Sequence, residues 1–387
     1  MRTASLKPTA VNSILAEVRE LQARGADLVS LMRGEPDLPT PPHIVEACVS
    51  ALRKGRTGYP DNRGEKSLRE AVAAKLAAVN GLTYDPGTEI LVTTGATFGI
   101  YAALMALLGE GEDVLLPDPI YDAYQSPIRL AGGNPVPVPS CLENGRFRLE
   151  SEALERAWTP STRVLLLNTP WNPTGTVFTA GELSGIAAFC KQYSVTLISD
   201  EIYEAITYDG AQHVSPLAVA PELRERCVLV NALSKTYSMT GWRVGYCAGP
   251  AHLIQRMFLI LQQSSRGPAT FVQDAAAVAL TGPQDCVRQM QAEYAARRHK
   301  VIDALSGIDC VRVIAPEGGF FAMVDVRGLG RNSGQIRRRL MDDYGVVVVH
   351  GAAYGEGGEG TLRVSFGSGG GTLSRGLERL AAGLRHI

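Results

Sequence analysis

Near the start of the chain, apolar and polar residues alternate with the period of a helix. Apolar residues three or four positions apart are Val11, Ile14, Leu15, Val18 and Leu21. This spacing, followed by Gly25, predicts an amphipathic helix over residues 9–24. A short apolar run then predicts a strand at 28–32, and helices are predicted at 43–54 and 66–79.

From residue 90 onward, short apolar runs alternate with segments of helical character. The predicted strands cover 90–94, 113–117, 163–167, 195–199 and 227–230, with an apolar helix at 98–108 after the first. A further apolar run occupies 242–248. Alternation of this kind predicts an α/β fold with a mainly parallel sheet and helices on both faces.

After Gly249 the pattern becomes helical and then mixed. Helices are predicted at 251–263, 271–280, 283–305, 334–343 and 372–384, and strands at 311–314, 318–324, 345–351 and 361–366. We therefore expect two domains. The large domain covers 45–275. The smaller α+β domain is made of 1–44, which includes an N-terminal arm, and 276–387.

Composition narrows the class of protein. The 387 residues are 45% hydrophobic and 20% charged, with a net charge of −1, and contain no long basic or acidic run. We expect a soluble globular protein that binds neither nucleic acid nor a membrane. The seven cysteines are scattered without a Cys-x-x-Cys pair, which argues against a disulfide framework or a metal site and favours the cytoplasm. No apolar leader or eighteen-residue apolar span is present.

One lysine has an unusual setting. Lys235 follows the apolar run 227–230, lies among small and hydroxyl side chains, and has no charged residue after it until Arg243. A desolvated amine is neutral and nucleophilic, which suits covalent capture of an aldehyde. The alternative, more common for a single lysine, is a side chain that extends from a strand end to solvent.

Three other features have both a chemical and a structural interpretation. Asp200 ends an apolar strand, where a carboxylate needs a partner, but it can also cap a helix. The turn 95–97 can direct N–H groups at a phosphate, although many such turns only begin helices. Arg363 interrupts an apolar strand and can bind a carboxylate in a bidentate manner. A lone arginine in a strand, however, more often forms a salt bridge at the sheet edge.

Four sequence strings occur together in the order of one family. They are Gly34-Glu-Pro-Asp37 followed by Thr40-Pro41, the asparagine- and proline-rich string 168–175, Asp200-Glu-Ile-Tyr203, and the lysine segment 231–246. With them the chain resembles the class I/II aminotransferases, which are pyridoxal-phosphate (PLP) enzymes of fold type I. The resemblance implies a three-layer fold and transfer of an amino group from an L-amino acid to a 2-oxo acid by a ping-pong mechanism.

The resemblance also implies roles for individual residues. Lys235 would bind the PLP aldehyde and act as the catalytic base, assisted by Asp200 at the ring nitrogen and Tyr203 at the ring oxygen. The remaining cofactor contacts would be Gly95, Ala96, Thr97, Ser234 and Arg243 at the phosphate, Tyr121 on the ring, Asn172 at the ring oxygen, and Tyr59 from a partner subunit. Substrate contacts would be Gly34, Asn172 and Arg363. A homodimer is therefore expected.

The chain departs from the family pattern at two positions. Ala232 stands where many relatives have a phosphate-binding serine, and His350 stands where proline is expected. Some relatives that use acidic substrates have a basic residue where this chain has Ala96. The sequence leaves the amino donor unassigned. An aspartate-like donor is one option, with Arg33 or Arg266, the latter from a neighbouring subunit, as alternative groups that would bind its side-chain carboxylate.

Two other functions are compatible with the same motifs. A substrate with a β leaving group would make the protein a C–S lyase. A non-catalytic effector-binding module of the same fold is the other alternative, although such proteins carry an additional DNA-binding domain, and Lys235 and Asp200 are both present here.

Overall fold

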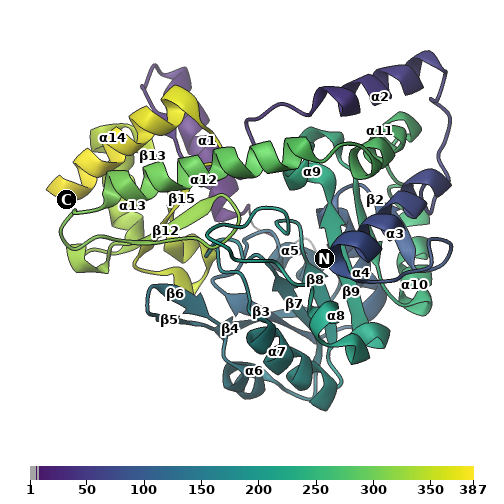
Figure 1. Cartoon of the computed structure of the whole chain (residues 1–387). Coiled ribbons are helices and arrows are strands. Elements are labelled where there is room, and N and C mark those ends of the chain that lie inside the picture. Colours follow the sequence, from purple (N-terminus) through teal and green to yellow (C-terminus); the bar gives the residue numbers. More distant parts are fainter. Residues whose placement is uncertain (1–5, 7) are drawn as a thin grey trace.

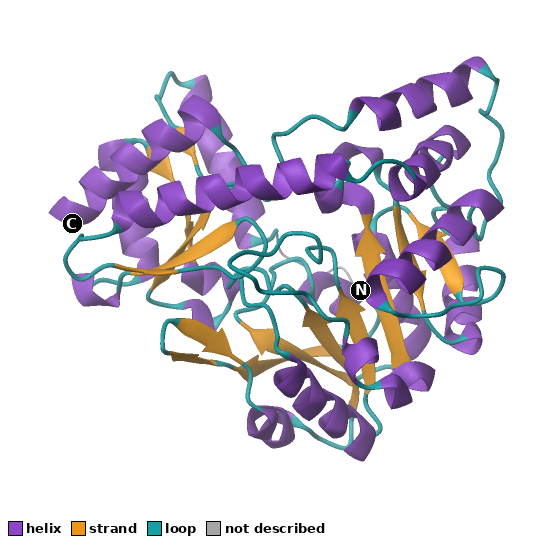
Figure 2. Ribbon diagram, viewed as in Figure 1, coloured by secondary structure: helices purple, strands orange, loops and turns teal. Residues whose placement is uncertain are grey.

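The computed structural model describes residues 6 and 8–387 and has two lobes (Figure 1). The large lobe surrounds a seven-stranded sheet, and the small lobe surrounds a four-stranded sheet. Helix α12 (Asp285–Leu305) extends from one lobe to the other. Figure 2 shows helices on the outside of the strands in both lobes.

The large sheet is parallel except at one strand. Its order is β2 (Ile90–Thr93), β10 (Gly245–Ala248), β9 (Cys227–Ala232), β8 (Thr196–Asp200), β7 (Thr162–Asn168), β3 (Asp113–Asp118), β4 (Asn134–Pro139). Strand β10 runs antiparallel to both of its neighbours. This arrangement confirms the predicted fold class.

Both faces of this sheet are buried. Successive residues of a strand therefore pack into two different hydrophobic cores, one on each face. Leu197 packs in one core and Ile198 in the other. One core is covered by α4 (Ala96–Leu107) and α10 (Ala251–Gln262), and the other by α3 (Lys66–Asn80), α7 (Ala180–Gln192) and α11 (Thr270–Thr281). Helix α2 (Pro42–Arg53) packs on α11. Strands buried on both faces give the continuous apolar runs seen in the sequence.

The small lobe is an antiparallel sheet with helices against it. The strand order is β11 (Arg312–Ile314), β12 (Phe321–Asp325), β15 (Thr361–Ser365), β14 (Val349–His350). Strand β1 (Val29–Ser30) pairs separately with β13 (Val346–Val347). The other helices are α1 (Ala10–Ala23), α13 (Ser333–Tyr344) and α14 (Gly370–His386).

Most predicted elements are present, with some changed bounds. The strand expected at 345–351 is instead two short strands, β13 and β14, which belong to different sheets. The helix expected at 98–108 begins at Ala96, so the turn before it is shorter than predicted. The apolar run 242–248 is a strand only from Gly245, because Arg243 has a positive φ of 55° that interrupts an extended backbone. The strand expected at 28–32 is two residues long.

Several elements between the motifs were not predicted. They are α5 (Gln125–Leu130), β4, the hairpin β5 (Cys141–Glu143) and β6 (Arg146–Arg148), α6 (Ser151–Ala157), α7, α8 (Pro216–Val219) and α9 (Leu233–Thr236). Helix α7 had a readable signal, because Thr179 and Glu182 form a capping box at its start. Strand β4 contains three prolines and lies at the sheet edge, where missing N–H donors are tolerated.

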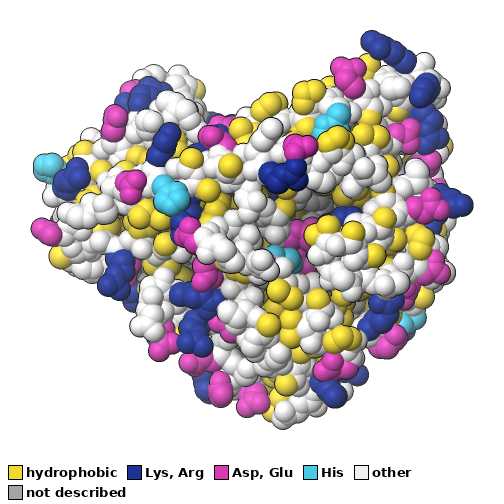
Figure 3. Space-filling model, viewed as in Figure 1, with side chains coloured by type: hydrophobic (Ala, Val, Ile, Leu, Met, Phe, Trp, Pro, Cys, Tyr) yellow, Lys and Arg dark blue, Asp and Glu magenta, His cyan; other side chains and the backbone are white. Residues whose placement is uncertain are grey.

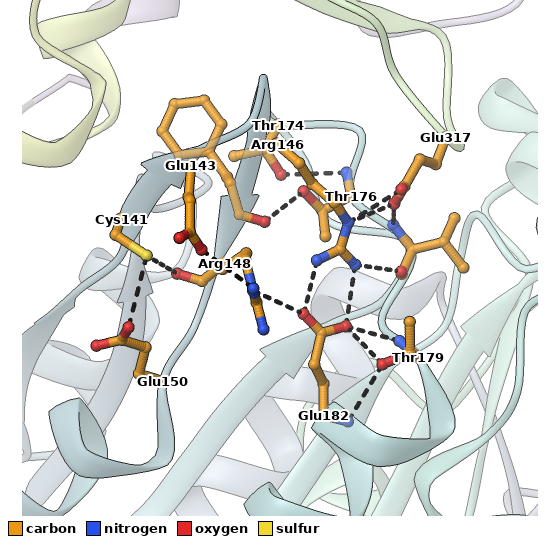
Figure 4. Close-up of polar contacts among 12 residues, drawn as sticks. Cys141, Glu143, Arg146, Arg148, Glu150, Thr174, Thr176, Thr179, Glu182 and Glu317 are labelled. Atoms are coloured by element: carbon orange, nitrogen blue, oxygen red, sulfur yellow. Dashed lines mark hydrogen bonds and ion pairs between the residues drawn. The ribbon is translucent and has the colours of Figure 1, made fainter.

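A cluster of charged residues joins the hairpin to the loop before β12 (Figure 4). The Arg146 guanidinium donates to both Glu317 oxygens, at 2.9 and 3.0 Å, and to both Glu182 oxygens, at 2.6 and 2.9 Å. Nearby, a Cβ placed on Gly175 would lie 2.3 Å from Pro316 Cβ, so glycine permits the two lobes to touch through their backbones.

The surface carries charges of both signs. Figure 3 shows Lys and Arg interspersed with Asp and Glu over the visible face. All seven cysteines are free thiols. Among the described residues, no helix is long and apolar enough to cross a bilayer.

Candidate active site

A cavity of about 950 Å³ lies between the lobes. Asn168 and Asp200, at the C-terminal ends of β7 and β8, line it together with the first residues of α4. Helix α1 and strand β15 supply the opposite wall. Ligands of open α/β sheets bind outside the carboxyl ends of the strands, and this cavity has that position.

Asp200 is the acidic group of the cavity and is 5% exposed. Its Oδ2 accepts a 2.5 Å hydrogen bond from the Tyr124 hydroxyl, and its Oδ1 accepts the N–H of Ile202 at 3.3 Å. Burial raises the pKa of Asp200 to about 6, while the Tyr124 bond lowers it. No helix begins directly after β8, so the helix-cap alternative for Asp200 is wrong.

Lys235 lies in α9, directly after β9, and its side chain lines the same cavity. The Nζ atom donates to the Gly34 carbonyl at 2.5 Å and lies 5.5 Å from the centre of the Phe320 ring. The pKa of Lys235 is lowered to about 8, mainly by burial and also by the charges of Arg243 and Arg363, while Asp200 opposes the shift. A lysine side chain that extends to solvent would keep its usual pKa and would not line a cavity. The alternative that Lys235 extends from the strand end to solvent is therefore wrong.

A cradle of backbone N–H groups lies at the start of α4. Gly95 has a φ of 84°, and a Cβ added to it would lie 2.8 Å from Nη2 of Arg243. Gly245 leaves similarly little room, since its Cβ would lie 3.0 Å from the Ala96 nitrogen. Ala96, Thr97, Ser234 and Arg243 all line the cavity. A helix N-terminus with an arginine beside it suits an anionic group.

Three further predicted residues line the cavity between its two sides. The Tyr121 ring packs edge-on against Tyr124, with centroids 5.1 Å apart. The Tyr203 ring packs edge-on against Phe320 and Phe321. The Asn172 N–H donates to Oδ1 of Asn168 at 2.7 Å, which fixes the backbone of the asparagine–proline turn. Burial raises the pKa of Tyr121 to about 12 and that of Tyr203 well above its usual value.

Arg363 enters the cavity from β15 and is 2% exposed. One Nη donates to the Met32 carbonyl at 2.9 Å and the other to Oδ1 of Asn172 at 3.3 Å. The guanidinium lies 4.2 Å from the Phe321 ring centre and 4.9 Å from that of Tyr354. Strand β15 is internal to its sheet, and among residues 6 and 8–387 Arg363 forms no salt bridge, so the edge salt-bridge alternative is wrong.

Several sequence candidates lie elsewhere. Tyr59 is 90% exposed and outside the cavity of this chain, and Arg266 is exposed. Arg33 lies at the cavity but forms an ion pair with Glu35. His350 does not line the cavity, and burial together with Arg337 lowers its pKa. Ala232 is buried in the core beneath the cavity.

The sequence interpretation missed Tyr124, Asn168 and Gly245. Asn168 and Gly245 lie inside quoted strings but had no role assigned. Tyr124, three residues after Tyr121, was readable only as a second aromatic. The cavity-facing side of α1, which includes Asn12 and Arg19, was also not anticipated.

Glu201, Glu204 and His213 form a cluster with one potential ligand atom each within 4.8 Å of one another. These groups already have partners. Glu201 accepts hydrogen bonds from Ser199 and Ser215 and contacts His213. Glu204 forms a close ion pair with a lysine of α3. Both carboxylates are therefore engaged by protein groups, although Nδ1 of His213 has no hydrogen-bond partner among the described residues.

Comparison with known proteins identifies the class. The chain superimposes on the aspartate aminotransferase of Rhizobium meliloti with a TM-score of 0.95 and 34% identity, over 99% of this chain and 98% of that one. It superimposes on a Pyrococcus horikoshii aromatic aminotransferase with a TM-score of 0.89 and 39% identity, over 94% and 97%. The fold is thus that of the fold type I enzymes, as predicted.

Sequence comparison identifies the family. The model of "Aminotransferase class I and II" matches residues 26–380. An aspartate aminotransferase of Geobacillus stearothermophilus is 36% identical over 98% of this chain and 97% of its own length. A probable aspartate/prephenate aminotransferase of Aquifex aeolicus is 39% identical over 100% and 96%. The chain belongs to the class I and II aminotransferases.

Its activity is therefore PLP-dependent transfer of an amino group from an amino acid to a 2-oxo acid. The residues of the cavity fit this cofactor. Gly95 allows Arg243 to approach the start of α4, where N–H groups and a cation together suit a phosphate, and Asp200 and Lys235 line the same cavity with chemistry suited to a pyridinium N–H and an aldehyde.

Proposed function

We propose that this cavity holds PLP between Asp200 and Lys235. Lys235 Nζ binds the aldehyde, and Asp200 accepts the ring N–H. The phosphate is bound by Gly95, Ala96, Thr97, Ser234 and Arg243, the ring by Tyr121, and the ring oxygen by Asn172 and Tyr203. The main support is that Asp200, at the end of β8, and Lys235, just after the neighbouring strand β9, both line one cavity with the first residues of α4.

Arg363 is proposed to bind the substrate α-carboxylate, together with Asn172 and beside Gly34. A buried guanidinium without a carboxylate partner among the described residues supports this role, because an uncompensated buried charge is costly. The planar guanidinium also fixes the orientation of a carboxylate that it binds through two nitrogens.

PLP, when bound, withdraws electrons from the substrate Cα. The amine of Lys235 would accept the proton that leaves the substrate Cα. The lowered pKa of this amine, about 8, supports a base that is partly neutral near physiological pH. Release of the 2-oxo acid before the second substrate binds gives ping-pong kinetics.

The proposed donor is an aspartate-like amino acid with a 2-oxo acid acceptor. Support comes from relatives with names such as aspartate aminotransferase, although an aromatic-amino-acid aminotransferase of Thermococcus litoralis is also 38% identical over 94% of both chains. The ion pair of Arg33 with Glu35 favours a partner's Arg266 as the reader of a side-chain carboxylate.

We also propose that the protein is a cytoplasmic homodimer. Each subunit would have a large domain, residues 45–275, and a small domain made of residues 1–44 and 276–387. Tyr59, at 90% exposure, is available to a second subunit. Exposed apolar side chains on α2 and α11, Val45, Leu52 and Val278, lie on the same lobe and suit an interface. Analytical ultracentrifugation of the wild type and of Leu52→Arg tests this arrangement, since a buried arginine would favour monomers.

The function is tested with a donor panel. Purified protein with PLP is given each amino acid with 2-oxoglutarate or pyruvate, and 2-oxo acid formation is measured. Fastest turnover with aspartate supports the donor assignment, and fastest turnover with aromatic donors overturns it. Pyruvate and ammonia released from cysteine-type substrates without an acceptor would instead indicate a lyase.

A further inference from the structure

Tyr124 donates the only side-chain hydrogen bond that the Asp200 carboxylate receives among the described residues. The tyrosine lies directly before α5 and is 6% exposed. Its hydroxyl is 2.5 Å from Asp200 Oδ2, and its ring is held edge-on against Tyr121 at an interplanar angle of 87°. The Tyr124 side chain is therefore held at its hydroxyl by Asp200 and at its ring by Tyr121.

The surroundings of Asp200 make this bond important for its ionisation. Burial and the charge of Glu201 raise its pKa, whereas Tyr124, the Ile202 N–H and Lys235 lower it. The other titratable groups that interact with it are Tyr121, Tyr203 and Cys247. All three are neutral near pH 7, because burial raises the pKa of each thiol or phenol. Tyr124 is thus the main neutral donor that favours the carboxylate form.

We propose that Tyr124 is a positioning residue for the cofactor: its hydroxyl holds Asp200 ionised and oriented, so that a free lone pair meets the pyridine N–H of PLP. The inference rests on the proposed function of Asp200. A protonated carboxyl would have no charge with which to stabilise a pyridinium. A carboxylate with no fixed donor would also be free to rotate away from the ring.

Tyr124→Phe removes the hydroxyl and retains the ring. The matched control is Tyr84→Phe, because Tyr84 is equally buried and its hydroxyl has no hydrogen-bond partner among the described residues. The probe is pyridoxamine 5′-phosphate, which has the same ring nitrogen but no aldehyde. Its binding to apoprotein is independent of covalent capture by Lys235.

The measured quantity is the dissociation constant of this probe between pH 5.5 and 9, obtained by calorimetry. Loss of a hydrogen bond to a charged group is expected to weaken binding of Tyr124→Phe about 10- to 100-fold at pH 7. The deficit should shrink as pH rises, because alkali ionises Asp200 without the help of the phenol. Tyr84→Phe should match the wild type at every pH.

A double-mutant cycle separates positioning from a general structural effect. In an Asp200→Asn background, Tyr124→Phe should change the dissociation constant less than about threefold. An equal loss in both backgrounds, or unchanged binding by Tyr124→Phe alone, would overturn the inference. If Tyr124→Phe does not fold, 3-fluorotyrosine placed at position 124 provides the test: a stronger donor should shift the pH profile of binding to lower pH.

Failure of the wider proposal has a different signature. If Asp200→Asn binds the probe as tightly as the wild type, Asp200 has no contact with the ring and the proposed site is wrong. If Asp200→Asn weakens binding and Tyr124→Phe does not, the site is upheld and only the role of Tyr124 is rejected.

Discussion

Asp200 in the large lobe and Arg363 in the small lobe are both buried charges that face one cavity, but they are supported differently. Asp200 accepts hydrogen bonds from Tyr124 and Ile202. Arg363 donates only to neutral oxygens, lies between two aromatic rings, and its Nε has no partner among the described residues. The comparison suggests a resident cofactor on the Asp200 side, and an exchangeable anion that supplies the missing charge on the Arg363 side.

The largest expected effect is on the Asp200 side, from Lys235→Ala. Removal of both the covalent anchor and the base should reduce kcat by a factor on the order of 10⁴ and abolish the absorption band that arises from covalent attachment of PLP to Lys235. Single-turnover assays and absorption spectra measure the two effects. Lys191→Ala, at an exposed position of α7, is the control and should retain both. A Lys235→Ala variant with normal turnover would contradict the assignment.

On the opposite side, Arg363→Leu should lower kcat/KM for every amino acid about 10²- to 10³-fold, because each substrate loses the same carboxylate contact. Its melting temperature should not fall, since removing an uncompensated buried charge offsets the lost hydrogen bonds. Steady-state kinetics and calorimetry test the two parts. A large loss of stability would mean that Arg363 has a structural role instead.

The rate at which apoprotein captures PLP should depend on pH through Lys235. The pKa of this amine is lowered to about 8, so its neutral, reactive fraction is small at pH 6 and nearly complete at pH 9. Capture should therefore accelerate about 10²-fold between these values and then level off. Asp200, with a pKa of about 6, is ionised over most of this range. Stopped-flow absorbance measures the rate, and a continued tenfold rise above pH 9 would contradict the lowered pKa.

The smallest expected effect concerns the contact between the lobes. Glu317→Gln weakens the bonds to Arg146 and should lower the free energy of unfolding by about 1 kcal/mol, with kcat/KM changed less than about threefold. Denaturant titration and kinetics provide the measurements. The control is Glu143→Gln. Glu143 lies on the hairpin that carries Arg146, but its arginine partner is exposed, so this substitution should have no effect. A tenfold loss of activity would contradict this expectation and show that the alignment of the lobes contributes to catalysis.

The sequence allowed the fold class and the family to be predicted because the large-lobe motifs are contiguous and follow buried strands. Asp200 ends an apolar run and Lys235 comes shortly after the apolar run 227–230, so strand order brings them to one edge of the sheet. Tyr124 could not be assigned, because its contact with Asp200 depends on the turn before α5, which has no periodic signal. The roles of all these residues remain predictions.

The small lobe was harder to interpret. Nothing in the string around Arg363 indicates which rings enclose it, since Phe321 and Tyr354 come from other segments. The hairpin that carries Arg146 was missed because strands of three residues have too few positions for an alternating pattern.

Helix α12 has a mechanical consequence. The residue before it, Gln284, accepts a hydrogen bond from Tyr237 near Lys235, while Arg297 in its later turns is bonded to Asp37 and to the Gly367 carbonyl. A rod of 21 residues is roughly 30 Å long, so a tilt of about 5° at its root moves its tip by roughly 3 Å. A small tilt of α12 beside the lysine would therefore produce an ångström-scale displacement at the far end of the helix.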